Sequence, residues 1–326
     1  MLQSIPPPPR DTEHKGTSAG EVKMIVQYVV AACVVLLFCS TQLCCMAIDL
    51  QPNTFDDQYI GCEGEMEKKM QTILKEERKY GQFDEMWREA TRHWGTRNLK
   101  LPDSFKHEYG VAVVLYTMET PHPIYKQLNG NVSIAGQSRD YYMKNFPFKA
   151  LHFYLTRALQ VLREGCAKRF TTYRGTKLGN INIAKEFRFG QFTSSSQDKS
   201  EAEKFGANPF FIISTCFGVD IDKFSEFDEL EVLIPVAEKF RNIKKSKNTY
   251  TVESTGQLCS YFNCAYLGGE KCRNPTCHSD LKLSSIEREE RIGNFHCSSG
   301  TFLYSGSSTR LFLGGLIMHI VIARLY

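Results

Sequence analysis

Residues 148–175 read FKALHFYLTRALQVLREGCAKRFTTYRG, and the change of pattern within this stretch decides the fold class. The first half predicts an amphipathic helix over 148–164, because its large apolar residues recur at helical spacing and Gly165 offers an end. After Cys166 the pattern changes, and Phe170–Tyr173 has the length and the β-branched and aromatic residues of a strand. A helical part therefore gives way to a strand-rich part near residue 166.

Upstream of this change the chain favours helices. Residues 62–97 are rich in Glu, Lys, Met and Arg, with apolar residues at helical spacing. Within residues 104–118, the run Val111–Tyr116 fits either a helix or a buried strand. The front of the chain is therefore expected to be mainly helical.

Downstream, short apolar runs alternate with Gly, Asn and Ser, and a short helix is expected at Lys199–Phe205. The expected strands are Phe170–Tyr173, Phe187–Phe192, Phe210–Phe217, Leu230–Ile234 and Thr249–Val252. A helical front and a strand-rich back predict an α+β domain.

Composition limits the class of protein. The chain has 326 residues, 42% of them hydrophobic and 12% aromatic, which suits a globular core. The formal net charge is +4, and basic residues are interspersed with acidic ones. No basic stripe indicates a nucleic-acid partner.

The N-terminal residues resemble a secretory signal. Residues 1–23 are polar, residues 24–38 are apolar, and small residues lead to Ala47, where cleavage is expected. The alternative is an uncleaved membrane anchor, although a span needs about 20 apolar residues.

The C-terminal residues resemble a glycosylphosphatidylinositol (GPI) attachment signal. Small residues at 298–300 and 305–308 precede a short apolar block at 311–323. The alternative is a plain C-terminal helix or a frayed tail. The expected organisation is an extension and signal at 1–47, one domain at 48–297 (mainly helical to 165, strand-rich from 166), and an attachment tail at 298–326. The protein is expected to be extracellular, at the cell surface through the anchor or else secreted.

Cysteine usage agrees with secretion. Apart from four cysteines in or beside the signal, eight remain: Cys62, Cys166, Cys216, Cys259, Cys264, Cys272, Cys277 and Cys297. An even number in a secreted chain predicts disulfides. The alternative is a zinc site at Cys272, Cys277 and His278, whose spacing fits no standard pattern well. Asn131-Val-Ser133 is a glycosylation sequon, in a stretch expected to be a loop.

Three segments of the strand-rich half carry residues suited to chemistry. Thr172–Gly175 places an arginine, which can bind phosphate or ribose oxygens, beside a glycine that lets a ligand approach the backbone. Arg188–Ser196 ends in three serines, which could hold a carboxylate or contact a sugar. The alternatives are a surface arginine before a turn and serines that cap the next helix.

The third segment is Glu229-Leu-Glu-Val-Leu-Ile-Pro235. If it is a strand, Glu229 and Glu231 point to the same side and form a candidate acid–base pair. The alternative is a solvated strand face that carries two charges.

These segments, in this order, resemble the arginine–serine–glutamate class of ADP-ribosyltransferases, and most closely the vertebrate ecto-ADP-ribosyltransferases. The resemblance covers most of residues 54–290. It is carried by Phe55–Cys62, Phe148–Arg157, Tyr173–Gly175, Phe189–Phe192, the serine triplet, Glu231–Pro235 and Ser254–Gly256. It implies a helical N-terminal part packed on a strand-rich core of two small sheets.

The resemblance also implies roles for individual residues. Arg174 would bind the NAD phosphates and the nicotinamide ribose, and Ser194 would orient the catalytic Glu231. Glu229 would be the upstream glutamate that is associated with arginine acceptors. Other implied NAD contacts are the backbone of Gly175, the aromatic ring of Phe192 and, more weakly, Gln191, Ser225 and Tyr116. The implied disulfides are Cys62–Cys264 and Cys166–Cys216.

The expected activity is transfer of ADP-ribose from NAD to exposed arginine side chains of acceptor proteins. NAD would be a consumed substrate, with no permanently bound cofactor and no metal. The alternatives are an NAD glycohydrolase and a non-catalytic, GPI-anchored recognition protein on the same scaffold. The sequence departs from the family pattern in three ways. Leu230 stands where many relatives carry Glu, the segment 220–231 is slightly short, and four cysteines exceed the pattern of two disulfides.

Overall fold

The computed structural model describes residues 46–79, 81–119, 123–225 and 227–279. The proposed tail at 298–326, nearly all of the proposed signal, and Cys297 lie outside these residues. The expected cleavage near Ala47 falls within strand β1 (Met46–Ile48), which pairs in parallel with β3 (Ile181–Ile183). No helix in the described part of the chain is long and apolar enough to span a bilayer.

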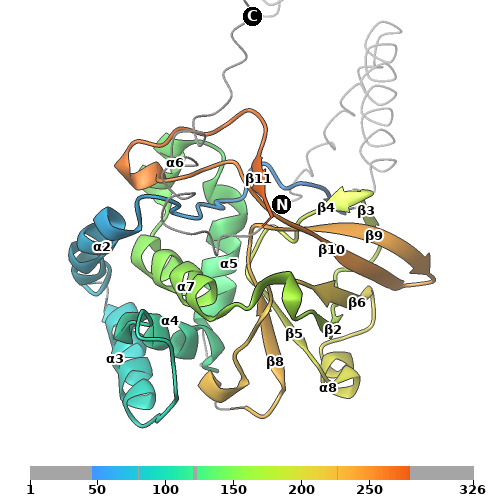
Figure 1. Ribbon diagram of the computed structural model, residues 1–326, viewed down its shortest axis with the longest axis horizontal. Helices are drawn as coiled ribbons and strands as arrows, with labels where there is room; N and C mark the ends of the chain where they lie inside the picture. Colours follow the sequence, from blue (N-terminus) through green and yellow to red (C-terminus); the bar gives the residue numbers. More distant parts are fainter. Residues whose placement is uncertain (1–45, 80, 120–122, 226, 280–326) are drawn as a thin grey trace, which may run out of the picture.

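The N-terminal half is helical, as predicted, and its helices pack together beside the strands (Figure 1). They are α2 (Glu63–Glu77), α3 (Gly81–Gly95), α4 (His107–Thr117), α5 (Ile124–Ala135), α6 (Arg139–Asn145) and α7 (Lys149–Leu162). The predicted helical region 62–97 is two helices, and the predicted helix 148–164 corresponds to α7. Residues 109–116 of α4 are all buried, which is why periodicity alone could not distinguish a helix from a strand there.

One prediction in this half is wrong. The stretch around the sequon Asn131-Val-Ser133 was expected to be a loop, but it lies in α5. The apolar residues Ile124, Leu128, Val132 and Ala135 are buried along one side of this helix, and that burial outweighs the helix-breaking tendency of its Asn and Gly residues. The side-chain amide of Asn131 donates to the Gln127 carbonyl one turn earlier (2.9 Å).

The C-terminal half forms two sheets of unequal size: the β1–β3 pair and a nine-stranded sheet. The order in the large sheet is β4-β9-β10-β6-β2-β5-β8-β7, with β11 added beside β10. Its strands are β2 (Phe170–Gly175), β4 (Glu186–Phe187), β5 (Thr193–Ser196), β6 (Phe210–Thr215), β7 (Val219–Asp220), β8 (Glu231–Ile234), β9 (Glu238–Ser246), β10 (Thr249–Ser260) and β11 (Thr276–His278). The α+β architecture is confirmed.

The large sheet is nearly divided where β2 meets β5. β2 pairs with β6 along its whole length, whereas the register of β2 with β5 is the one pair Tyr173–Ser196. β5 in turn pairs with β8 over four residues. The two groups of strands therefore diverge from a shared point, and space for a ligand can open between them.

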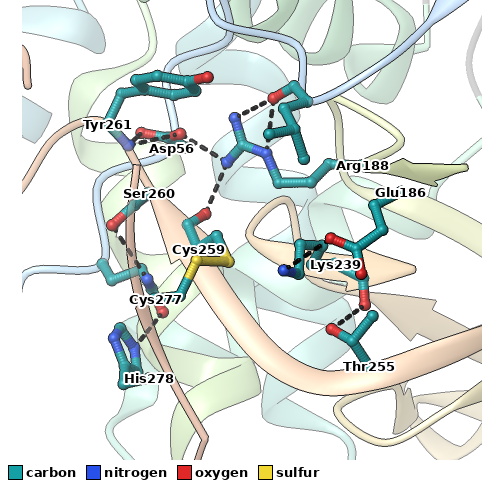
Figure 2. The surroundings of a disulfide bond; sticks show 12 residues. Asp56, Glu186, Arg188, Lys239, Thr255, Cys259, Ser260, Tyr261, Cys277 and His278 are labelled. Atoms are coloured by element: carbon teal, nitrogen blue, oxygen red, sulfur yellow. Dashed lines mark hydrogen bonds and ion pairs between the residues drawn. A yellow bond between two sulfur atoms is a disulfide. The ribbon is translucent and has the colours of Figure 1, made fainter. Parts of the chain in front are cut away.

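The strand predicted at Phe187–Phe192 is wrong in its extent. β4 ends at Phe187, and the chain then turns through Gly190, whose φ is 73°. Arg188 causes this departure, because its fully buried guanidinium binds Asp56 (2.6 Å), the Cys259 carbonyl (2.7 Å) and the Leu50 carbonyl (2.7 Å) (Figure 2). These bonds join the N-terminal segment to β10 and hold the start of the loop that leads to β5.

Three disulfides lie within the described residues. Cys62–Cys264 and Cys166–Cys216 confirm the pairs that the resemblance implied. The third, Cys259–Cys277, joins directly opposed residues of β10 and β11 (Figure 2). Because Cys277 is bonded to Cys259, the alternative zinc site at Cys272, Cys277 and His278 is excluded.

Candidate active site

A pocket of about 520 Å³ opens where the two groups of strands diverge. All nine residues singled out from the sequence line it: Tyr116, Arg174, Gly175, Gln191, Phe192, Ser194, Ser225, Glu229 and Glu231. They come from β2, β5, β8, the end of α4 and two loops. The fold thus brings together residues that are more than 100 positions apart in the sequence.

Arg174 and Gly175 end strand β2 at the edge of this pocket. Arg174 extends from β2 toward β5, and its Nη1 donates to the Ser194 carbonyl (2.6 Å). Desolvation lowers the pKa of Arg174, and electrostatic interactions with the Tyr116 hydroxyl and the Glu231 carboxylate oppose that shift. The guanidinium is therefore held in place and partly shielded from water.

Gly175 allows helix α8 (Lys199–Lys204) to pack against β2. A Cβ at this position would lie 2.1 Å from the Gly206 carbonyl oxygen and 2.2 Å from that of Ala202. Both oxygens belong to the end of α8 and the turn after it, so they cannot be moved by a side-chain rotation. Glycine at this position is required by packing, independently of any contact with a ligand.

Strands β5 and β8 present serines and a glutamate to the pocket. Ser196 is directly opposite Glu231 in the antiparallel ladder, so the two side chains share a face with Ser194, two residues earlier. The Ser196 hydroxyl donates to the Glu229 carbonyl (2.6 Å) and accepts from the Asp198 backbone N–H (2.9 Å). The N-cap residue of α8 is Asp198, so the alternative that Ser196 caps this helix is wrong.

Glu231 is the buried carboxylate of the site, with 8% of its surface exposed. Desolvation raises its pKa to about 7, the hydrogen bond from Ser194 opposes this shift, and the charge of Glu229 adds to it. Arg174 also lowers the pKa of Glu231. Near neutral pH this carboxyl can therefore exist in both protonation states, a property common at functional sites.

Glu229 reaches the same pocket by a different route from the one predicted. β8 begins at Glu231, and Leu230 adopts a left-handed conformation with φ of 49°, so Glu229 lies in the preceding loop and not on the strand. The Leu230 N–H donates to the Asp222 carboxylate (2.9 Å), and the Leu230 carbonyl accepts from the Gln197 N–H (3.0 Å). These two bonds stabilise the turn. Desolvation and the charges of Glu201 and Glu119 raise the pKa of Glu229.

Tyr116 and Phe192 form the inner wall. The Tyr116 hydroxyl donates to the Phe192 carbonyl (3.2 Å) and accepts from the Asn129 amide (3.1 Å). Burial raises the pKa of Tyr116 to about 12, so it remains a neutral donor. Phe192 is 1% exposed and its ring packs on His152 at a centroid distance of 5.4 Å, so the ring supports the wall from the core side.

Gln191 and Ser225 line the pocket from two different loops. Gln191 follows Gly190 in the loop before β5, and its backbone carbonyl accepts from the Thr193 hydroxyl (3.2 Å). Ser225 caps a turn, with its hydroxyl accepting from the Phe227 N–H (3.1 Å). Both side chains belong to loops, whereas Arg174, Ser194 and Glu231 belong to strands.

Sequence reasoning missed the contribution of α5. Tyr125, Lys126, Asn129 and Gly130 of this helix also line the pocket. Asn129 is buried and its amide bonds both the Phe192 carbonyl (3.0 Å) and the Tyr116 hydroxyl. The spacing of the apolar residues in 124–135 was the signal that could have revealed the helix.

Charges of both signs face this pocket, which suits a ligand that is itself dipolar. Arg174 and Lys126 can bind anionic groups, while Glu119, Glu229 and Glu231 can stabilise positive charge. In the part of the chain that the structure describes, no group of three or more metal-ligating side chains gathers. The arrangement can bind an extended phosphate-containing molecule and stabilise a cation that forms beside Glu231.

Comparisons with known proteins agree with this geometry. A family model described as NAD:arginine ADP-ribosyltransferase matches residues 48–260. Ecto-ADP-ribosyltransferase 5 of Rattus norvegicus is 44% identical over 243 residues, covering 70% of this chain and 79% of that protein. Erythroblast NAD(P)(+)–arginine ADP-ribosyltransferase of Gallus gallus is 38% identical over 254 residues, covering 74% and 82%.

A solved structure is also similar to this chain. A crystal structure of a mutant of the eukaryotic mono-ADP-ribosyltransferase ART2.2 in complex with NAD is similar, with a TM-score of 0.61 and 35% identity. The match covers 68% of this chain and 99% of that one.

Proposed function

This chain belongs to the NAD:arginine ADP-ribosyltransferase family, and we propose that it transfers ADP-ribose from NAD to arginine side chains of acceptor proteins, with Glu231 as the catalytic carboxylate. The observation that carries the proposal is the convergence of Arg174, Ser194 and Glu231 on one buried pocket. NAD is consumed in this reaction, and nicotinamide is released.

The residues of the strands bind NAD and break its glycosidic bond. Arg174 binds the diphosphate and bends the dinucleotide, with its guanidinium already oriented by the Ser194 carbonyl. Cleavage of the bond between the ribose and the cationic nicotinamide leaves the electron pair on nicotinamide and positive charge on the ribose. Glu231, held by Ser194, stabilises that charge as a carboxylate.

The loop residue Glu229 acts on the acceptor. A guanidinium is fully protonated in solution, so the attacking nitrogen must lose a proton as its bond to the ribose carbon forms. Glu229 lines the same pocket as Glu231 and attracts the acceptor guanidinium by its charge. Its raised pKa makes it a better proton acceptor than an ordinary carboxylate. Tyr116, Gln191 and Ser225 complete the contacts with NAD.

The first test concerns Glu231. We expect the variant Glu231→Gln to lower NAD turnover by about 10²–10³-fold, because the amide cannot stabilise positive charge on the ribose. The measurement is release of nicotinamide by the purified secreted chain, with the exposed Glu253→Gln as a matched control. Unchanged turnover in Glu231→Gln rules out this carboxylate, and a wild-type chain without any turnover supports the non-catalytic alternative.

The second test separates transfer from hydrolysis. We expect Glu229→Gln to reduce formation of ADP-ribosyl-agmatine by about 10²-fold while NAD hydrolysis continues, because hydrolysis involves no guanidinium that must lose a proton to Glu229. The products are quantified after incubation with NAD and agmatine. If the wild-type chain produces free ADP-ribose and no agmatine adduct, it is an NAD glycohydrolase and the transferase assignment is wrong.

The location of the activity forms part of the proposal. Relatives named ecto-ADP-ribosyltransferases, together with the disulfides of this chain, support a site of action outside the cell. We place the catalytic domain at 48–297 and attribute surface attachment to residues 298–326. Release of the protein from intact cells by a GPI-specific phospholipase tests the attachment, and protein that stays bound after treatment contradicts it.

A further inference from the structure

The loop that carries Glu229 is fixed from outside the strand core. This loop, defined here as residues 221–225 and 227–230, connects β7 to β8 and supplies both Ser225 and Glu229 to the pocket. By contrast, Glu231 lies in the β5–β8 ladder and Arg174 in the β2–β6 ladder. Strand pairing fixes Arg174 and Glu231, whereas the positions of Glu229 and Ser225 depend on how the loop is held.

Arg97, beyond the C-terminus of α3, holds this loop. Its Nη1 donates to the Lys223 carbonyl and its Nη2 to the Ser225 carbonyl, both at 2.9 Å. A single planar guanidinium thus bonds two carbonyls that flank Phe224, a geometry that a lysine cannot reproduce. These are charge-assisted bonds, which are stronger than bonds between neutral groups.

Trp94, one turn earlier, supports the same contact. Its ring stacks on that of Phe224 at a centroid distance of 5.6 Å with 4° between the planes. Gly110 of α4 lets the indole approach closely, because a Cβ at Gly110 would lie 2.2 Å from the ring. The helical half therefore holds the loop by stacking and by two hydrogen bonds.

We propose that Arg97 is a positioning residue for arginine acceptors: it holds the loop so that Glu229 faces the reacting centre, and it thereby sets the ratio of transfer to hydrolysis. This inference rests on the proposed function and adds a residue in the helical half to it. Arg97 does not line the pocket and has no direct part in cleavage of the glycosidic bond.

The test is the variant Arg97→Gln in the secreted chain, assayed with NAD and agmatine. We expect the ratio of agmatine adduct to free ADP-ribose to fall about tenfold, the equivalent of one charge-assisted hydrogen bond, with a raised KM for agmatine. At saturating NAD, hydrolysis without agmatine should change less than about twofold, because strand pairing holds Glu231 independently. Arg97→Lys should restore part of the ratio, since one of the two bonds can form.

Arg92→Gln is the matched control, because Arg92 lies near Arg97 in the sequence, in the last turn of α3, and bonds Glu89 of that helix and not the loop. A second readout is amide hydrogen exchange. In Arg97→Gln, the amides of Ser225 and Leu230 should exchange faster while those of Val232 and Leu233 do not.

Two outcomes overturn the inference: an unchanged ratio in Arg97→Gln, or an equal loss of transfer and hydrolysis. Either outcome leaves the proposed function intact if the wild-type chain still forms the adduct. A wild-type chain that forms none contradicts the proposed function itself.

Discussion

At the scale of single residues, Glu231 is buried although its proposed role requires a negative charge, which burial disfavours. The carboxylate lies among strands where water cannot solvate it fully, and Ser194 and Arg174 compensate in part. Desolvation nevertheless prevails and the pKa rises to about 7. A residue of this kind reduces the stability of the fold while it prepares the site for a cationic transition state.

This balance predicts a pH-dependent stability. Because the folded pKa of Glu231 is about 7 and its ordinary value is 4.5, the folded state retains the proton over this range. The stabilising contribution of the neutral form is complete below pH 4.5 and is lost as the pH rises through about 7. Glu231→Gln, which stays neutral, should therefore unfold like the wild type near pH 4 but be more stable by roughly 2–3 kcal/mol at pH 8.

Thermal unfolding at both pH values measures this difference, which corresponds to about 5–10 °C in Tm. Glu253→Gln is the control, because the side chain of Glu253 is half exposed and its ion pair with Arg169 lies at the surface, where such pairs contribute little to stability. Equal Tm values for wild type and Glu231→Gln at pH 8 would show that burial of the ionised Glu231 carboxylate does not destabilise the folded protein.

At the scale of elements, the pocket exists because β2 and β5 share a single residue pair and then separate. Helix α8, between β5 and β6, closes one side of this separation by packing on Gly175 of β2. The backbone of α8 lies so close to β2 that even one methyl group has no space. Contact between these two elements therefore determines the shape of the pocket edge.

Gly175→Ala tests this contact. Its Cβ would overlap two backbone carbonyls, so we expect α8 to move and the protein to lose about 1–3 kcal/mol of stability. Urea denaturation measures the loss. The control is Gly64→Ala in α2, where a Cβ would meet nothing within 4 Å, and there we expect a gain of about 0.5–1 kcal/mol from helix propensity. A Gly175→Ala protein as stable as the wild type contradicts the packing argument.

At the scale of the whole molecule, two segments some 200 residues apart join the helical and strand-rich halves. Asp56 accepts from the N–H groups of Tyr261 and Phe262, and Asp57 accepts from those of Cys264 and Ala265. The Cys62–Cys264 disulfide lies at the end of this contact. Burial raises the pKa of Asp57 to about 6, although three backbone bonds oppose the shift.

The disulfides should therefore differ in their contribution to stability. Cys62–Cys264 has a sequence separation of 202 residues and Cys259–Cys277 one of 18. On the chain-entropy argument, replacing the first pair by alanine should cost about 2 kcal/mol more than replacing the second. Guanidinium denaturation of the two double variants measures this, and equal losses would indicate that local packing, and not loop closure, dominates.

The sequence predicted much of the fold and the set of pocket residues, with limits that have physical causes. Helix α7 and strands β2, β6 and β8 were recognised because their apolar residues follow a period and turn residues end them. α5 was mistaken for a loop because Asn and Gly disfavour helices locally, while its buried face stabilises it only in the folded protein. β9 was not predicted, because Glu238–Ser246 is largely charged and gains its stability from pairing with β10.

The sequence alone determined the residue types of the site motifs, which are Tyr173–Gly175, Thr193–Ser196 and Glu229–Glu231. It could do so because family motifs and disulfide cysteines are properties of the chain itself. Tertiary structure alone decided how Glu229 reaches the pocket, why Gly175 must be glycine, and that Arg97 holds the loop. Each of these depends on atoms that lie far apart in the chain: the Gln197 N–H on the Leu230 carbonyl, the carbonyls of α8 and its following turn beside Gly175, and the Arg97 guanidinium on the carbonyls that flank Phe224. Local sequence cannot encode such contacts, because they form only when packing of the core brings distant segments together.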